Sequence, residues 1–254
     1  MAKLIVMNGV GFGYPGQTPI LSTVNFEINE GDRISILGPN GSGKSTMALL
    51  IAGLLAPTSG EISGFTNRPS VGIVFQNSRH QMVGSTVEDD LAFGLSLMNL
   101  TTDDLQKRVA YFLSEFKLAS KRHYNINQLS GGELRRLALA SVLITEPRIL
   151  ILDEPLAMLD KEAQSIFLNC LKANVHPETA LIWFDHEVRS IRHTVRWMVL
   201  SKQGRLNPVS LNDLDSRLFL KSHSLTPAPL QWLEWEFPGR ISGAIFGPER
   251  ITFD

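Results

Sequence analysis

The sequence is poor in cysteine, since Cys170 is the only one among its 254 residues. A single cysteine cannot form an internal disulfide, so the chain must fold without one, and this scarcity is typical of proteins in the reducing cytosol. We interpret Cys170 as a small apolar residue of a helix and assign it no reactive role.

Two further absences exclude classes of function. A membrane-spanning helix needs about 18 consecutive apolar residues, and no stretch of the sequence approaches that length. We therefore expect no membrane-spanning helix. The net charge is −1, and proteins that bind nucleic acid as their main role usually carry an excess of basic residues, so no nucleic-acid partner is expected. Residues 1–7 hold one charge and a short apolar run, which predicts a first strand rather than a signal peptide.

The length and the 43% of hydrophobic residues suffice for one large α/β domain, with or without a small appendage. Near the N-terminus, turn signals separate three candidate strands, Lys3–Met7, Val24–Ile28 and Arg33–Leu37. These strands follow one another too closely for crossover helices. The N-terminal part is therefore predicted to be a mostly antiparallel β layer.

A glycine-rich stretch follows the apolar run Ile34-Ser35-Ile36-Leu37, and a segment predicted to be helical, residues 47–55, comes next. The stretch reads Gly38, Pro39, Asn40, Gly41, Ser42, Gly43, Lys44, Ser45 and Thr46. This is the Walker A pattern between a strand and a helix. Glycines let successive backbone N–H groups form a nest for phosphate oxygens, and the helix N-terminus adds its positive dipole end. Lys44 can reach the β- and γ-phosphates and the Ser45 hydroxyl can ligate magnesium, so a nucleoside triphosphate site is predicted.

A second motif ends the fully apolar run Ile149-Leu150-Ile151-Leu152, where two adjacent carboxylates follow. This is the Walker B pattern, in which Asp153 would hold magnesium and Glu154 would polarise the attacking water. Buried neighbouring acids are costly unless a cation or hydrogen bonds compensate them, which argues against a purely structural role.

Polar side chains also follow two other buried strands. Gln76 comes after residues 71–75, and His186 comes shortly after residues 180–184. The carboxyl ends of parallel strands are where ligands bind in such sheets. We expect Gln76 to reach magnesium or a water molecule, and His186 to contact the γ-phosphate.

Tyr14 lies in the turn Phe12-Gly13-Tyr14-Pro15. An exposed aromatic ring there could stack on adenine, or it could pack onto the edge of the sheet, and the turn taken alone favours packing.

Residues 78–130 change to a helical pattern. A helix capped by Thr86 is predicted to run to about Met98, and a second, from Thr102, carries the apolar stripe Leu105, Val109, Phe112, Leu113 and Phe116. The basic run Lys121-Arg122-His123 is interpreted as a solvated patch. The stretch Leu129-Ser130-Gly131-Gly132-Glu133 opens a further helix, where it is either a second anion site or an ordinary N-cap.

Taken in order, these features resemble the ATP-binding-cassette (ABC) ATPases over roughly residues 2–206. The set comprises Tyr14, Gly38–Thr46, Gln76, Leu129–Glu133, Leu150–Pro155, Leu159-Asp160 and His186. The resemblance implies that Tyr14 stacks on adenine and that Gln76 is the Q-loop residue. It also implies that Ser130, Gly131, Gly132 and Glu133 form the signature, that Asp160 is the D-loop acid and that His186 is the switch histidine.

The same resemblance implies an α/β fold: a P-loop NTPase cassette with a RecA-like core, an N-terminal antiparallel β subdomain and an α-helical signature subdomain. The cassette would span residues 1–206, with the helical subdomain at about 78–145, and residues 207–254 would form a small C-terminal extension. It further implies ATP and Mg²⁺ as ligands, and a dimer in which the signature of one subunit covers the phosphates held by the other. Whether the second ABC ATPase subunit is identical or a paralogue stays open.

A narrower resemblance joins the chain to the ATPase subunits of energy-coupling factor (ECF) transporters, which take up metal ions or vitamins. It rests on Phe12–Gly16, Val74–Asn77, Gln81 and Gly84–Leu95, whereas Ser78-Arg79-His80 departs from the more acidic segment usual there. It implies a peripheral location on the cytoplasmic side of the membrane, and an integral membrane subunit docking near residues 77–97. The alternatives are another ABC importer or exporter, and a soluble ABC ATPase.

Overall fold

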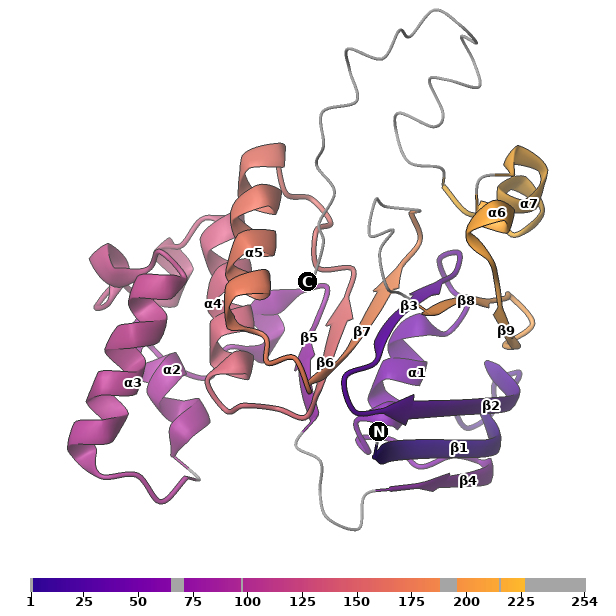
Figure 1. Cartoon of the computed structure of the whole chain (residues 1–254), viewed down its shortest axis with the longest axis horizontal. Helices are drawn as coiled ribbons and strands as arrows, with labels where there is room; N and C mark the ends of the chain where they lie inside the picture. Colours follow the sequence, from indigo (N-terminus) through magenta and orange to yellow (C-terminus); the bar gives the residue numbers. More distant parts are fainter. Residues whose placement is uncertain (1, 65–70, 97, 188–195, 215, 227–254) are drawn as a thin grey trace, which may run out of the picture. The chain divides into compact units, whose positions relative to one another are not determined.

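The computed structural model of the protein describes residues 2–64, 71–96, 98–187, 196–214 and 216–226 (Figure 1). The chain divides into two compact units. The first contains the described residues of Met1–Pro69 and Ala180–Asp254, and the second those of Ser70–Thr179. The predicted boundary between a cassette and an extension at residue 206 stays a prediction.

The first unit contains the predicted antiparallel layer, a three-stranded sheet of order β2-β1-β4. Its strands are β1 (Lys3–Phe12), β2 (Leu21–Asn29) and β4 (Ser59–Ser63), and both pairings are antiparallel. The first two strands extend beyond the predicted runs, through Val10 and Phe12 of β1 and Leu21 of β2, with register shifts between Met7 and Val10 and between Val10 and Phe12.

The third candidate strand, β3 (Arg33–Leu37), leaves this layer, which corrects the expectation for residues 3–37 as a whole. It pairs in parallel with β7 (Ala180–Asp185) and β8 (Arg196–Leu200), and β9 (Leu206–Pro208) pairs antiparallel with β8. All six residues of β7 are buried, as is typical of a central parallel strand. The glycine-rich loop leads from β3 into α1 (Lys44–Ile51), a helix that ends before Leu55, the last residue of the predicted helical segment.

The second unit contains the parallel pair β5 (Val71–Val74) and β6 (Ile149–Asp153), in register from Val71 opposite Ile149 to Val74 opposite Leu152. Its two longer helices after the signature are α4 (Gly131–Leu143) and α5 (Lys161–Asn174). These helices pack on one another, and α4 also packs on β5. The strands therefore end beside a helix that begins with the signature residues.

The rest of this unit is helical, as predicted, with α2 (Val87–Leu95) and α3 (Thr102–Glu115) as its main elements (Figure 1). Thr86 caps α2 with a reciprocal bond to Asp89, and α2 ends three residues before the predicted end. The apolar stripe of α3 is buried except at Leu105, which is half-buried. Short 3₁₀ turns lie at Ser78–Gln81, Ala119–Lys121 and Ile126–Gln128.

The basic run at residues 121–123 is more than a solvated patch. Arg122 Nε donates to Glu88 Oε2 at 2.8 Å, and His123 Nδ1 lies 3.3 Å from the same oxygen. Lys121 Nζ lies 3.5 Å from Glu133 Oε1. Sequence spacing did not reveal these partners because they belong to other elements.

After β9 the first unit ends in two short helices, α6 (Leu211–Leu214) and α7 (Arg217–Ser222). They contribute to a buried apolar cluster of Leu37, Trp197, Val199, Leu214, Leu220 and Leu225. Residues 227–254 of the predicted extension, which include Pro227, Pro229, Trp232 and Trp235, lie outside the described residues. Within the described parts of the chain, no helix is long and apolar enough to cross a membrane.

Candidate functional site

The glycine-rich loop is shaped by close approaches that only glycine permits. A Cβ at Gly38 would lie 2.6 Å from Ser42 Oγ and 2.7 Å from the carbonyl oxygen of Leu200. Gly43 has a φ of 98° and serves as the N-cap of α1, a left-handed conformation that other residues rarely adopt. Asn40, Gly41 and Ser45 are exposed, so the loop presents an accessible face at a helix N-terminus.

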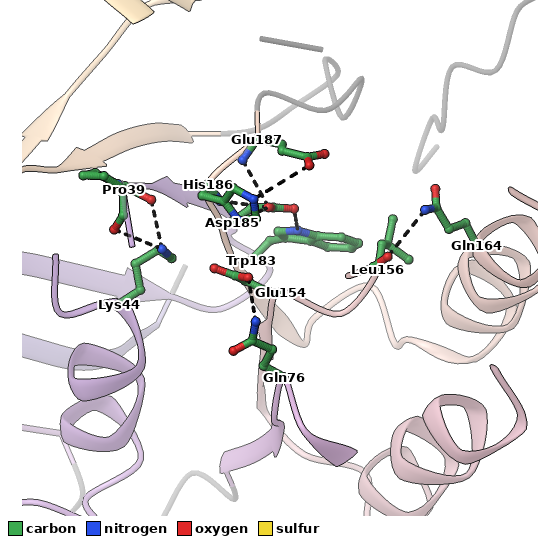
Figure 2. Close-up of polar contacts among 11 residues, drawn as sticks. Pro39, Lys44, Gln76, Glu154, Leu156, Gln164, Trp183, Asp185, His186 and Glu187 are labelled. Atoms are coloured by element: carbon green, nitrogen blue, oxygen red, sulfur yellow. Dashed lines mark hydrogen bonds and ion pairs between the residues drawn. The ribbon is translucent and has the colours of Figure 1, made fainter. Parts of the chain in front are cut away.

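Lys44 lies inside this loop, although lysine is rarely buried. Its Nζ donates to the carbonyl oxygens of Gly38 at 2.9 Å and Pro39 at 3.3 Å (Figure 2). Ser42 Oγ is buried and has no hydrogen-bond partner among the described residues. A buried ammonium and an unsatisfied hydroxyl in one loop favour an anionic ligand, which would accept hydrogen bonds from both.

Tyr14 packs on the edge of the sheet, which is one of the two expected arrangements, and its stacking on adenine stays a prediction. Its ring meets Phe12 edge to face, with centroids 5.0 Å apart, and 37% of the residue remains exposed. One edge therefore packs on the sheet, and part of the ring stays accessible for stacking.

Asp185, at the end of β7, connects the glycine-rich loop with the candidate histidine. Its carbonyl oxygen accepts a hydrogen bond from Gly38 N at 3.1 Å. Its buried carboxylate accepts from His186 N at 2.8 Å, from Glu187 N at 3.2 Å and from Trp183 Nε1 at 3.4 Å (Figure 2). His186 Nδ1 lies 3.5 Å from Asp185 Oδ1. The loop and His186 are thus held by one residue.

In the second unit, the two strand ends bring Gln76 and Glu154 together. Gln76 Nε2 donates to Glu154 Oε2 at 3.0 Å (Figure 2). Asp153 and Glu154 are both buried, and Glu154 has a φ of 45°, in the left-handed region. A non-glycine residue in this conformation is uncommon and often marks a functional site.

Arg135 links the signature helix to these strand ends. Its guanidinium is buried, and Nη1 donates to the carbonyl oxygen of Phe75 at 2.9 Å. Burial lowers the pKa of Arg135, and the charge of Asp153 opposes that shift. The positive charge of α4 therefore lies near the acid that the sequence assigned to magnesium.

The signature residues form the helix N-cap that was one of the two alternatives. Ser130 N donates to Glu133 Oε2 at 2.9 Å, and Glu133 N donates to Ser130 Oγ at 3.3 Å. Burial raises the pKa of Glu133, but hydrogen bonds with Ser130 and the charge of Lys121 outweigh it, so the pKa lies below its usual value. Ser130 and Gly131 are exposed, so their accessible face leaves the other alternative, an anion site, open.

The D-loop acid lies close to this helix start. Asp160 caps α5 by accepting from Ala163 N at 2.8 Å, and a Cβ at Gly132 would lie 3.1 Å from the Cβ of Ala163. The structure therefore brings Gly132 and the first turn of α5 into contact. In the same D-loop, Met158 is fully exposed and has a φ of 61°.

The donors available for magnesium are Ser45 in the first unit and Asp153 and Gln76 in the second. No cluster of three or more His, Cys, Asp or Glu residues able to hold a metal occurs in the described ranges. Hydroxyl, carboxylate and amide oxygens are all donors that magnesium accepts, and this ion is usually held by one or two protein ligands with phosphates and waters. The types of these residues therefore fit the ion that the resemblance implies.

Sequence reasoning missed Asp185 and Arg135 as members of this arrangement. Asp185 could have been noticed as an acid ending a fully apolar strand, the same signal that identified Asp153. In the sequence, nothing distinguishes Arg135 from its neighbour Arg136. The structure shows that both are equally buried, and that Arg136 donates instead to the carbonyl oxygen of Phe116.

Comparison with known proteins agrees with these features. Residues 21–157 match the family model described as ABC transporter. The chain is 35% identical over 238 residues to the energy-coupling factor transporter ATP-binding protein EcfA of Methanosarcina acetivorans, covering 89% of this chain and 87% of that protein. It is 36% identical over 219 residues to EcfA1 of Enterococcus faecalis, covering 81% and 78%.

Two solved structures are also similar. One is cbiO1 from Clostridium perfringens, part of the ABC transporter complex cbiONQ, with a TM-score of 0.72, 27% identity and coverage of 94% of this chain and 97% of that chain. The other is the dimeric structure of MJ0796, a bacterial ABC transporter cassette, with a TM-score of 0.69, 27% identity and coverage of 80% and 96%. Both confirm the predicted α/β fold of a P-loop cassette. The chain belongs to the ABC transporter family, as an ATP-binding and ATP-hydrolysing subunit of the energy-coupling factor type.

Proposed function

We propose that this ATPase powers the uptake of a micronutrient, either a metal ion or a vitamin, from the cytoplasmic face of the membrane through an integral membrane partner. The observation that carries the proposal is the 3.0 Å hydrogen bond from Gln76 to Glu154. Gln76 directly precedes the segment proposed to dock on the membrane subunit, and Glu154 is the proposed water-activating group. A displacement of that segment would therefore move Gln76 and change its hydrogen bond to the Glu154 carboxylate.

In the nucleotide site, we assign Tyr14 to the adenine and residues 38–46 to the phosphates. Lys44 would exchange its bonds to the Gly38 and Pro39 carbonyl oxygens for phosphate oxygens. Ser45, Gln76 and Asp153 would hold Mg²⁺, whose charge neutralises the phosphates when it is bound.

In the hydrolytic step, Glu154 would orient and polarise the attacking water, and Gln76 would hold the Glu154 carboxylate in place. His186 would contact the γ-phosphate from a backbone fixed by Asp185. The uncommon φ of Glu154 supports this assignment, because such strain persists only where the surrounding structure over-determines it.

A second ABC ATPase subunit would complete each site with its own Ser130, Gly131, Gly132 and Glu133. The exposed Ser130 and Gly131 support this arrangement, as does Met158, an exposed apolar residue beside Asp160. An identical partner would give two competent sites, since every residue required is present in this chain. Mass determination of Glu154→Gln with ATP tests it, because a monomer under those conditions would contradict the proposal.

Docking of the membrane subunit would use residues 77–97, where Val83 and Phe93 are exposed. The loop before α2 is held firmly, since Val83 N and Gly84 N donate to Asp90 Oδ1 at 2.8 Å and 3.0 Å. The other oxygen of this buried carboxylate accepts from Ser141 Oγ of α4 at 2.6 Å. A surface fixed in this way can transmit force to the signature helix instead of yielding locally.

The test is co-purification of the membrane subunit with Phe93→Ser, and Tyr111→Ser is the matched control. Both aromatic residues are 55% exposed, but Tyr111 lies on α3, outside the docking segment. Phe93→Ser should reduce recovery of the membrane subunit, whereas Tyr111→Ser should not. Equal recovery in both variants would refute the docking surface. Identifying the co-purified proteins separates ECF-type uptake from another kind of ABC transport.

A further inference from the structure

The C-terminal extension returns to the nucleotide site after leaving the sheet. From β9 the chain forms α6 and α7, turns at Ser224 with a φ of 53°, and then runs back toward the end of β7. Thr226 forms an isolated parallel bridge with Glu187. Its backbone N donates to the carbonyl oxygen of His186 at 3.1 Å. The extension therefore reaches the backbone of the residue proposed to contact the γ-phosphate.

This contact is anchored by apolar burial immediately before it. Leu225 is buried in the cluster that contains Leu37 of β3 and Trp197 of β8, together with residues of α6 and α7. Leu225 N also bonds to the carbonyl oxygen of Leu220 at 2.9 Å, which fixes the turn. Because Leu37 directly precedes Gly38, the same cluster supports the strand that carries the phosphate loop.

His186 is thus held from both sides along its backbone. Its N–H donates to Asp185 Oδ1 at 2.8 Å, and its carbonyl oxygen accepts from Thr226 N at 3.1 Å. The Asp185 contact comes from the residue just before it, whereas the Thr226 contact comes from a different part of the chain. Of the two bonds, only the one from Thr226 N to the His186 carbonyl oxygen therefore depends on the position of the extension.

We propose that Leu225 and Thr226 position His186 for the γ-phosphate, with Leu225 as the apolar anchor and the Thr226 amide as the donor to the His186 carbonyl oxygen. The inference rests on the proposed role of His186. A partner that displaced α6 and α7 would release this bond and slow hydrolysis without touching the nucleotide. The extension thereby acts as a positioning element of the ATPase site.

The experiment compares Thr226→Pro with Thr226→Ala in the full chain. Proline removes the amide donor, whereas alanine keeps it. Because the Thr226 side chain is exposed, its loss should matter little in either variant. We expect Thr226→Pro to lower kcat about fivefold, the effect of one hydrogen bond, with KM and ATP affinity unchanged. Thr226→Ala should behave as wild type, and equal kcat values in these two variants would overturn the proposal.

A double-mutant cycle with His186→Ala shows whether the effect passes through the histidine. If it does, adding Thr226→Pro to His186→Ala causes no further loss of kcat. Losses that multiply would overturn the proposal while leaving the role of His186 intact. Wild-type turnover of His186→Ala would instead refute the proposed function of that residue, and with it the positioning role.

A second variant guards against misfolding of Thr226→Pro. Leu225→Ala keeps every backbone donor and weakens the apolar anchor, so it should lower kcat by a larger factor than it lowers ATP affinity. If Thr226→Pro no longer binds ATP, Leu225→Ala decides the question. A wild-type kcat for Leu225→Ala in that case would overturn the proposal.

Discussion

Replacement of Asp185 by alanine tests the connection between the phosphate loop and His186. The substitution removes a buried carboxylate that accepts from His186 N, Glu187 N and Trp183 Nε1. Bonds to a charged acceptor contribute about 1.5–3 kcal/mol each, although the 3.4 Å bond to the indole is weak. In the variant, water can partly replace the carboxylate at the backbone N–H groups of His186 and Glu187, which reduces the total cost of the lost bonds. We therefore expect a loss of about 3 kcal/mol in the free energy of unfolding.

This loss corresponds to a decrease of about 6–12 °C in Tm for a chain of this size. Thermal unfolding followed by circular dichroism measures it, and steady-state ATPase assays measure the accompanying fall in kcat. Asp185→Asn is the matched control, because its single oxygen can still accept both backbone N–H groups at Oδ1 and only the indole bond is lost. The Tm of Asp185→Asn should lie between those of the wild type and Asp185→Ala. A wild-type Tm for Asp185→Ala, or a lower Tm for Asp185→Asn than for Asp185→Ala, would refute the reasoning.

Three further outcomes follow from the site and its surroundings. Glu154→Gln should bind ATP normally but lose at least about a hundredfold in kcat, because amides are poor bases, and wild-type hydrolysis would remove Glu154 from its role. Lys44→Ala should weaken ATP binding in a nucleotide titration, and unchanged affinity would contradict the phosphate-loop assignment. The bond from Arg122 lowers the pKa of Glu88, so this pair stabilises the fold above the unfolded-state pKa, and the contribution is lost as the pH falls through the lower folded-state value. Arg122→Ala should therefore cost up to about 1 kcal/mol at pH 7 and less at acidic pH in urea titrations, and a cost that does not fall with the pH would contradict the pairing.

The sequence alone identified the motifs because each is a local device. The strand, glycine-rich turn and helix of the phosphate loop are contiguous, and the acids that end β6 follow a run of apolar residues that is recognisable without a fold. The caps at Thr86, Ser130 and Asp160 are equally local, since each side chain binds an amide three residues ahead. The antiparallel character of the first strands followed from their spacing.

Tertiary structure decided which residues of these motifs and of other elements contact one another. Gln76 and Glu154 are 78 residues apart, Arg135 and Phe75 are 60 apart, and Ser141 and Asp90 are 51 apart. The same holds for β3, whose spacing suggested the antiparallel layer but whose burial on both faces places it between parallel strands. It holds for Thr226 and His186 as well, because a backbone amide carries no side-chain signal. Local chemistry specifies a group and its capacity to bind, whereas its partner is selected by packing across the chain, which no short pattern encodes.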